Sequence, residues 1–191
     1  NPGKFVSAIL KLFSRAKDEN ITPEEFLAWA LSANGEQRTE NGERINSDKL
    51  EKEKWVELAG AFAKYEALKI KESRLDFGDL IIWTHKLFKE RAALCRKYRQ
   101  QFRYLLIDEF QDTNYTQYQL IKSLAPAGAS PNLLVCADDD QAIYCFRGAS
   151  VANVLAFKND YPDSALITLC ENYRSVQPIL DAANQLIQNN T

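Results

Sequence analysis

The sequence lacks the features that define several classes of protein. No apolar run approaches the roughly 20 residues that a membrane-spanning helix needs, and no signal peptide is recognisable at the start. Cysteine is scarce, and no C-x-x-C pair or second histidine accompanies His85, which excludes the usual zinc sites. We therefore expect reduced, packed thiols in a cytosolic protein. The four cysteines are Cys95, Cys136, Cys145 and Cys170.

Excess positive charge is also missing. The 24 basic and 26 acidic residues give a formal net charge of -2, so the sequence as a whole has no attraction for a polyanion. Binding of nucleic acid would need local basic groups and aromatic platforms. The 191 residues, of which 46% are hydrophobic and 26% charged, suffice for one or two domains with a buried core.

The first part of the chain, up to about Leu75, is predicted to contain only helices and polar connections. Apolar residues recur at helical spacing over 5–13. In Thr22-Pro23-Glu24-Glu25, Thr22 can cap a helix, Pro23 suits the first helical position, and Glu25 can close a capping box. The polar stretch 33–47 indicates a loop, and apolar positions over 55–65 predict a long helix. We expect a small all-α bundle.

After Leu75 the pattern alternates between helical periodicity and short, continuous apolar runs. Such runs are typical of strands buried on both faces of a parallel sheet. Each run ends in polar residues, at the edge where open α/β sheets bind their ligands. The sequence therefore predicts an α/β fold with a ligand edge built from three strand ends. The predicted helices are 77–87, 117–124 and 151–161, and the predicted strands are 104–107, 133–136 and 165–169.

The first strand end presents two adjacent carboxylates, Asp108 and Glu109. Magnesium prefers hard oxygen ligands and keeps several waters, so one carboxylate suffices to hold it. The neighbouring carboxylate is then placed to orient or deprotonate a water molecule. The pair indicates phosphate-transfer chemistry. The alternative is an acidic strand end that is only solvated surface.

The second strand end, 138–149, combines acidic, amide, aromatic and basic groups. Gln141 offers both a donor and an acceptor, which suits it to sense a terminal phosphate or to hold a water molecule. Binding of a single strand requires aromatic rings on which bases stack and a cation that contacts phosphate, and both kinds of group follow Gln141. These groups are Tyr144, Phe146 and Arg147. The alternative is a solvated turn followed by packed aromatic rings.

The third strand end is 171–175. Arg174 is always charged and can stabilise a phosphate, and Tyr173 can stack on a base. The alternative is that Ser175 only caps a helix that continues to Ile187.

In order and spacing, these segments resemble the second, third and fourth motifs of superfamily-one DNA helicases of the UvrD/Rep/PcrA type. The resemblance implies an incomplete RecA-like parallel sheet flanked by helices, after an all-α subdomain. It divides the chain into 1–74 (subdomain 1B), 75–170 (second half of RecA-like domain 1A) and 171–191 (start of domain 2A). The matching segments are 107–114 (IDEFQDTN), 138–149 (DDDQAIYCFRGA) and 172–175 (NYRS), with 75–80 (LDFGDL) where the family re-enters the motor domain.

The resemblance also implies ATP and Mg²⁺ as cofactors and a role for each motif residue. Asp108 and Glu109 would be the metal site, with Glu109 also activating water. Gln141 would contact the terminal phosphate and couple it to DNA. Tyr173 would pack on the adenine, and Arg174 would reach the terminal phosphate. The single-strand DNA track would be lined by Tyr144, Phe146 and Arg147.

The chain departs from the family mainly by an absence. No G-x-x-x-x-G-K-[ST] loop occurs, and Gly3-Lys4 lacks the upstream glycine and the following hydroxyl of such a loop. The phosphate loop is expected upstream of Asn1 and the last two motifs downstream of Thr191. We therefore expect the complete protein to hydrolyse ATP and this chain alone to be inactive. Gly78 and Cys145 depart from the usual family residues without affecting this expectation.

The leading interpretation is a fragment of an ATP-dependent 3′–5′ DNA helicase of DNA repair or replication, cytoplasmic and nucleoid-associated if bacterial. The expected partners are single-stranded DNA, the duplex junction and the rest of the same chain, namely the Walker A half and domains 2A and 2B. No membrane partner is expected. A sheet that lacks strands leaves an exposed edge, through which we expect the fragment to self-associate.

Three alternatives remain open from the sequence. The chain can be the helicase part of a recombination helicase-nuclease, which a nuclease domain after Thr191 would reveal. It can be a non-catalytic DNA-binding or partner-docking module, for which salt-dependent single-strand binding weakened by Phe146→Ala would be diagnostic. It can also be a metal nuclease built on Asp108, Glu109, Asp112 and the run 138–140. A two-metal nuclease needs carboxylates that converge on metals about 4 Å apart. The placement of Gln141 and Arg174 favours phosphate sensing over this last alternative.

Overall fold

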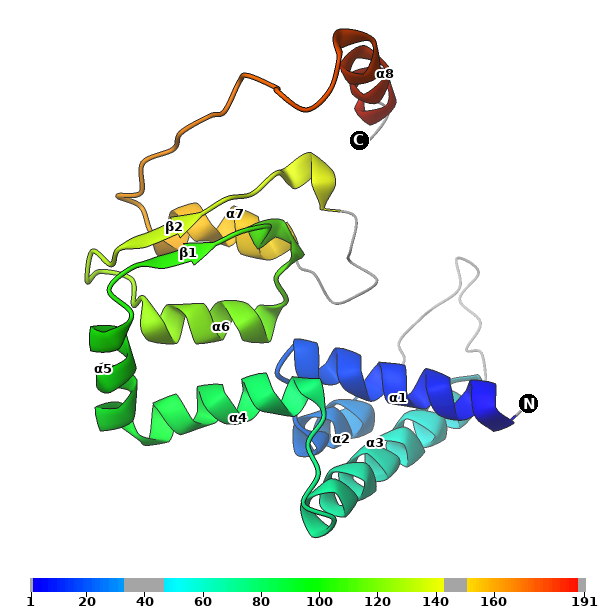
Figure 1. Ribbon diagram of the computed structural model, residues 1–191. Coiled ribbons are helices and arrows are strands. Elements are labelled where there is room, and N and C mark those ends of the chain that lie inside the picture. The colour runs from blue at the N-terminus through cyan, green and yellow to red at the C-terminus, as the bar shows by residue number, and fades with distance from the viewer. Residues whose placement is uncertain (1, 33–46, 143–150, 189–191) are drawn as a thin grey trace.

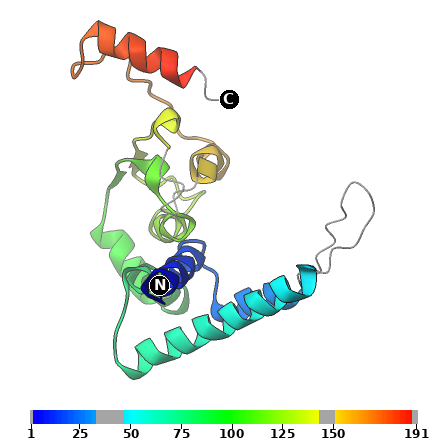
Figure 2. The same cartoon turned by 90° about the vertical axis from the view of Figure 1, so that its right-hand side faces the viewer.

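The computed structural model describes residues 2–32, 47–142 and 151–188. A helical part is followed by a part that contains a small sheet, and α8 lies beyond the sheet (Figure 1). Turned by 90°, the two parts follow one another along the molecule, with α3 extending to one side (Figure 2). In the ranges that the structure describes, no helix is both long and apolar enough to cross a bilayer.

The helical part consists of α1 (Pro2–Asp18), α2 (Pro23–Ser32) and α3 (Ser47–Lys71). The predicted capping box at the start of α2 is confirmed. The Thr22 N–H donates to Glu25 Oε2 at 2.8 Å, and the Glu25 N–H donates to Thr22 Oγ1 at 3.2 Å. The predicted loop falls on residues 33–46, which lie outside the described ranges, and on Ser47, which begins α3.

The three helices share one apolar core. Phe13 of α1 stacks on Phe62 of α3, with ring centroids 4.7 Å apart, and Phe26 of α2 meets Phe62 edge to face at 6.4 Å. Burial of such rings is the main favourable term in packing helices together. The prediction of an all-α first part is therefore confirmed. The buried residues of this core are Phe13, Ala16, Phe26, Ala59 and Phe62.

The second part confirms the predicted α/β class. Two short strands, β1 (Leu105–Ile107) and β2 (Leu133–Val135), pair in parallel with Leu106 opposite Leu134. The connection between them contains α6, as parallel pairing requires a crossover. The other elements are α4 (Phe77–Glu90), α5 (Ala92–Gln101), η1 (Phe110–Asp112), α6 (Tyr115–Leu124), η2 (Asp139–Gln141), α7 (Val151–Asp160) and α8 (Gln177–Ile187).

The prediction that the strands are buried on both faces is wrong. Ile107 and Val135 pack into a core formed with α6 and α7, whose buried members are Phe110, Tyr118 and Tyr161. The opposite face carries Leu106 and Leu134, which are 71% and 51% exposed. Side chains alternate between the faces of a strand, so one covered face leaves every second residue in solvent. Nothing in the described ranges covers that second face.

The third predicted strand, 165–169, is also not formed. Strands are held by ladder hydrogen bonds to a neighbour, and this run passes from α7 toward α8 away from β1 and β2 (Figure 1). Leu166 and Leu169 are 89% and 88% exposed as a result. Ser175 does not cap α8 either, because the N-cap position is Val176, without a side-chain hydrogen bond.

The prediction of packed thiols holds for one of the described cysteines only. Cys95 on α5 is buried, and its Sγ donates to the Ser123 carbonyl at 3.3 Å. Cys136 and Cys170 are free but exposed, because each follows a run that packs on one side at most. Cys145 lies outside the described residues.

A buried ion-pair network joins the two parts of the chain. The Lys17 Nζ on α1 lies 2.8 Å from Glu66 Oε1, 2.5 Å from Asp76 Oδ2 and 2.7 Å from Asp79 Oδ1. The Lys69 Nζ on α3 lies 2.5 Å from Asp79 Oδ2. Asp76 and Asp79 also form the capping box of α4. Two lysines of the helical part thus anchor the first turn of the helix that leads into the sheet.

Gly78 has a packing role that the sequence did not indicate. A Cβ at this position would lie 3.0 Å from Cδ and 3.3 Å from Cβ of Lys17. The Lys17 stem cannot easily move aside, because its ammonium is held by carboxylates on α3 and α4. Glycine in the first turn of α4 therefore makes room for the buried lysine.

We expect this chain alone to self-associate through the open sheet face, because exposed apolar surface next to unpaired strand edges favours association. Sedimentation should show an average mass that rises with concentration. The double substitution Leu106→Lys and Leu134→Lys should return the chain to a monomer. Leu68→Lys, at a position 55% exposed on α3, is the matched control and should not. A wild-type chain that stays monomeric at every concentration would contradict the expectation.

Candidate nucleotide site at the strand ends

The two strand ends that the sequence singled out lie side by side. The ladder continues past the strands, since the Cys136 N–H donates to the Ile107 carbonyl and the Phe110 N–H donates to the Cys136 carbonyl, both at 2.8 Å. Asp108 and Glu109 therefore run beside 136–138. The parallel arrangement brings both polar segments to the same edge, as expected for the ligand edge of an α/β sheet.

Glu109 occupies an unusual backbone position. Its φ of 48° and ψ of 46° lie in the left-handed region, which costs a non-glycine residue roughly 1–3 kcal/mol. This conformation turns the chain from β1 into η1 and leaves the side chain exposed at the sheet edge. Its Oε2 accepts a hydrogen bond from Gln111 Nε2 at 2.7 Å. Both the backbone and the carboxylate of Glu109 are thus held in place.

Asp108 has the free ligand atom that a magnesium site needs. Its Oδ1 accepts the Glu109 N–H at 3.0 Å, and its other oxygen accepts no hydrogen bond from the described parts of the chain. The side chain is exposed. Magnesium is usually held by one or two carboxylates together with waters and substrate phosphates. The donor set at this edge fits that ion.

The second strand end is folded around Asp138. Its Oδ2 accepts from Gln141 Nε2 at 2.6 Å, and its Oδ1 accepts the Asp140 N–H at 3.2 Å. The Gln141 N–H donates to the Asp138 carbonyl at 3.2 Å, which closes the turn η2. Gln141 itself is exposed, on the same edge as Glu109. The amide is therefore oriented by Asp138 and still open to a ligand.

Gln111 connects the two strand ends, and sequence reasoning assigned it no role. Its side chain is 1% exposed, and its Oε1 accepts the Asp138 N–H at 3.1 Å while its Nε2 bonds Glu109. A signal was present, because a glutamine amid carboxylates is the one side chain there that can both donate and accept. Only the fold places Asp138 against it.

The segment 171–175, predicted as the third strand end, does not lie beside the other two (Figure 1). Tyr173 is 93% exposed, and the backbone N–H of Arg174 donates to Asn172 Oδ1 at 2.9 Å. Among the described residues, the side chain of Arg174 makes no hydrogen bond or ion pair. The segment leads to α8, beyond the sheet (Figure 1). The residues expected to line a DNA track, Tyr144, Phe146 and Arg147, lie outside the described ranges.

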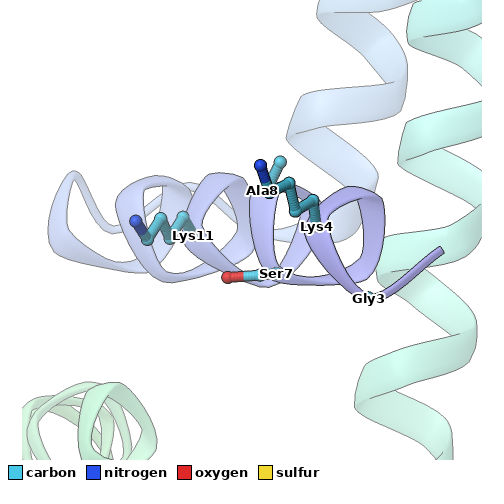
Figure 3. Close-up of a pocket in the computed structure, with 5 residues that line it drawn as sticks. All are labelled: Gly3, Lys4, Ser7, Ala8 and Lys11. Atoms are coloured by element: carbon cyan, nitrogen blue, oxygen red, sulfur yellow. The ribbon is translucent and has the colours of Figure 1, made fainter. Parts of the chain in front are cut away.

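Gly3 and Lys4 do not form a phosphate loop in this structure. Both belong to α1, so their backbone follows a helix and not a loop that wraps a phosphate. The hollow beside them, about 480 Å³, is lined by residues of α1 alone (Figure 3). The lining residues are Gly3, Lys4, Ser7, Ala8 and Lys11. This placement agrees with the sequence, in which Gly3-Lys4 lacks the other residues of a phosphate loop.

The arrangement of carboxylates does not favour a two-metal nuclease. Both oxygens of Asp138 already accept hydrogen bonds. Over the described ranges, the one group of three metal-type ligands within 4.8 Å of each other is Glu66, Asp76 and Asp79. The ammonium groups of Lys17 and Lys69 occupy that cluster. Of the remaining strand-end carboxylates, Asp108 and Glu109 are adjacent in the sequence and both exposed.

Comparison with known proteins agrees with the motifs. The sequence matches the family described as UvrD/REP helicase N-terminal domain over residues 3–162. The ATP-dependent DNA helicase PcrA of Bacillus subtilis (strain 168) is 40% identical over 192 residues, which cover 100% of this chain and 23% of the relative. PcrA of Leuconostoc citreum is 38% identical over 95% of this chain and 21% of the relative. PcrA of Staphylococcus aureus is 42% identical over 70% of this chain and 18% of the relative.

This chain therefore spans between 18% and 23% of the length of these relatives. The resemblance is confirmed, because the family match covers the helical part and the sheet part, and the Bacillus subtilis relative aligns with the whole chain. The chain belongs to the UvrD/REP helicase N-terminal domain family.

Proposed function

We propose that this chain is part of an ATP-dependent DNA helicase that moves 3′ to 5′ along single-stranded DNA and unwinds duplexes. The observation that carries the proposal is the pairing of two strand ends, where Glu109 and Gln141 are exposed on one edge and linked through a series of hydrogen bonds. Exposed, oriented polar groups at that edge are what nucleotide hydrolysis requires. The similarity to PcrA proteins, named as ATP-dependent DNA helicases, supports the same function.

In this proposal each residue has a role in breaking the terminal phosphate bond of ATP. Glu109 orients a water molecule and accepts its proton as the water attacks, which yields ADP and phosphate. Gln141 senses the terminal phosphate, and Tyr173 packs on the adenine. Arg174 stabilises the charge on the transferred phosphoryl group. Because Tyr173 and Arg174 lie apart from the strand ends here, ATP has to be bound between two parts of the complete protein.

Asp108 would hold the magnesium ion, with Glu109 beside it. When bound, the ion supplies positive charge that neutralises the phosphate oxygens. The free carboxylate oxygen of Asp108 and its exposure support this assignment. Asp108→Asn would leave the fold intact, because the backbone bond from Glu109 can still be accepted by an amide oxygen.

The remaining assignments complete the proposal. Residues 1–74 form the 1B-like insertion, 75–170 the second half of domain 1A, and 171–191 the start of 2A. Single-stranded DNA runs along Tyr144, Phe146 and Arg147, and the duplex junction lies near the helical insertion. The partners of this chain are DNA and the remaining domains of the same cytoplasmic protein. The separate hydrophobic cores of the two parts support the first boundary.

We expect this chain alone to show no measurable DNA-stimulated ATP hydrolysis. It contains no G-x-x-x-x-G-K-[ST] loop, whose lysine and backbone amides hold the β and γ phosphates. A turnover assay with ATP, Mg²⁺ and single-stranded DNA checks this. Clear activity of the isolated chain that Glu109→Gln abolishes would contradict it.

The test of the proposed function uses the complete protein that contains this chain. ATP hydrolysis should depend on Mg²⁺ and rise on addition of single-stranded DNA. A duplex with a 3′ single-stranded tail should be unwound, and one with only a 5′ tail should not. Hydrolysis that ignores DNA, or DNA cleavage in place of unwinding, would show the proposal to be wrong.

A further inference from the structure

Gln111 is the most buried polar group near the strand ends. It lies in η1 and is 1% exposed, and the nitrogen and the oxygen of its amide each make a hydrogen bond. Its Nε2 donates to Glu109 Oε2 at 2.7 Å, and its Oε1 accepts the Asp138 N–H at 3.1 Å. A buried amide with both ends satisfied has one defined orientation. Its partners are therefore held at a fixed separation.

The series of hydrogen bonds continues to Gln141, the exposed glutamine of the second strand end. Asp138 donates its backbone N–H to Gln111 Oε1, and its Oδ2 accepts from Gln141 Nε2 at 2.6 Å. The structure thus contains an unbroken series of hydrogen bonds from Glu109 through Gln111 and Asp138 to Gln141. Two residues that lie 32 positions apart by their numbers become one rigid unit.

Neither ionised glutamate nor methionine can make both hydrogen bonds of Gln111. Glutamate would set a second carboxylate against Glu109, and methionine would leave the Asp138 N–H without an acceptor. A residue needed only to fill space beside Phe110 would be apolar, because a buried amide is costly unless it is fully bonded. We therefore attribute the presence of a buried amide here to its hydrogen bonds with Glu109 and Asp138.

We propose that Gln111 is a positioning residue that holds the Glu109 carboxylate toward its water molecule and ties it to the turn carrying Gln141. The proposal rests on the proposed function, because it assigns Glu109 the role of activating water. Contact of Gln141 with a phosphate is then transmitted to the carboxylate through Asp138 and Gln111. Water activation by Glu109 is thereby coupled to phosphate sensing by Gln141.

The test replaces Gln111 in the complete protein with glutamate and with methionine. Loss of a hydrogen bond to a charged group should lower kcat for DNA-stimulated ATP hydrolysis roughly 10- to 100-fold in each variant at pH 8. The KM for ATP should change less than about threefold, since the phosphate and adenine contacts remain. The matched control is Gln117→Glu, because Gln117 accepts the Asn114 N–H and glutamate serves that capping position equally well.

The separate effects on kcat and KM distinguish a positioning role from a merely structural one. A role in positioning Glu109 lowers kcat in both variants while the KM for ATP stays within about threefold of wild type. General damage to the strand ends would disturb ATP binding as well and would raise KM.

Each outcome decides the proposal. A low kcat with a nearly unchanged KM in both variants, and an unchanged kcat in Gln117→Glu, supports it. A kcat within about twofold of wild type, or a rise in KM as large as the fall in kcat, overturns it, since the second pattern is what structural damage gives. If wild-type protein hydrolyses no ATP, or Glu109→Gln stays active, the proposed function fails first and is distinguished from a failure of the role of Gln111.

Discussion

Replacing Glu109 with glutamine in the complete protein is expected to reduce kcat for DNA-stimulated ATP hydrolysis by about 100- to 10,000-fold. Glutamine keeps the size and polarity of the side chain but cannot accept a proton from water. Its backbone conformation should be kept as well, since the left-handed φ of 48° is set by the turn from β1 into η1. The KM for ATP and the affinity for single-stranded DNA should change little, because Glu109 binds neither base nor DNA.

The control for this substitution is Glu90→Gln, which removes one negative charge from an exposed carboxylate at the end of α4. It should leave kcat unchanged. Steady-state kinetics at saturating DNA measures both variants. A Glu109→Gln protein that keeps more than about a tenth of wild-type kcat would mean that water is activated by another group.

Replacing Lys17 with methionine is expected to lower the free energy of unfolding by about 3–5 kcal/mol. Lys17 is 3% exposed, and its ammonium contacts carboxylates of Glu66, Asp76 and Asp79. Without it, three carboxylates face Lys69 alone, and buried like charges are left uncompensated. The apolar stem of methionine still fills most of the space, so the loss arises from charge. Urea unfolding of the chain at low concentration measures the effect.

The pH dependence of stability follows from the same network. Burial opposes ionisation of Asp76 and Asp79, but hydrogen bonds from Lys17 and Lys69 outweigh it and hold the pKa of each carboxyl below its ordinary value. A lowered carboxyl pKa stabilises the fold above the ordinary value of about 3.9, and this stability is lost as pH falls below it. For Lys69, burial is outweighed by hydrogen bonds to Asp79 and its neighbours, so its pKa is raised. Its contribution is lost only above about pH 10.4.

Acidification therefore gives a second readout for Lys17→Met. The stability difference from wild type should shrink below about pH 4, because protonation removes the uncompensated carboxylate charge. The control is Lys64→Met on α3, which removes an exposed lysine and should change the free energy of unfolding by less than about 0.5 kcal/mol. Equal effects of the two substitutions would show that the network contributes nothing beyond surface charge.

Local patterns in the sequence were enough to predict much of the fold. The capping box at Thr22 and Glu25 depends on residues three positions apart, and it forms as expected. The two parallel strands follow from apolar runs of the right length, and their polar ends meet because parallel strands share one edge. Asp108 and Glu109 could therefore be placed beside the turn of Gln141 before the structure was known.

Features that depend on distant or missing neighbours could not be predicted. The Lys17 network joins residues about 60 positions apart, as with Lys17 and Asp79, and no local pattern marks them as partners. The bond between Gln111 and Asp138 requires the exact register of β1 and β2. The apolar run at 165–169 has strand composition but no adjacent strand in the described ranges, so it remains unpaired and exposed.

A single-turnover measurement tests the central claim most directly, namely that these strand ends form a hydrolytic site. The complete protein, bound to single-stranded DNA, is mixed with radiolabelled ATP and Mg²⁺ and quenched in acid at successive times. Wild-type protein should form labelled phosphate at a rate at least equal to its kcat, and Glu109→Gln should bind the same amount of ATP yet form phosphate about 100-fold or more slowly. Phosphate formation at the wild-type rate by Glu109→Gln, with only product release slowed, would contradict the account.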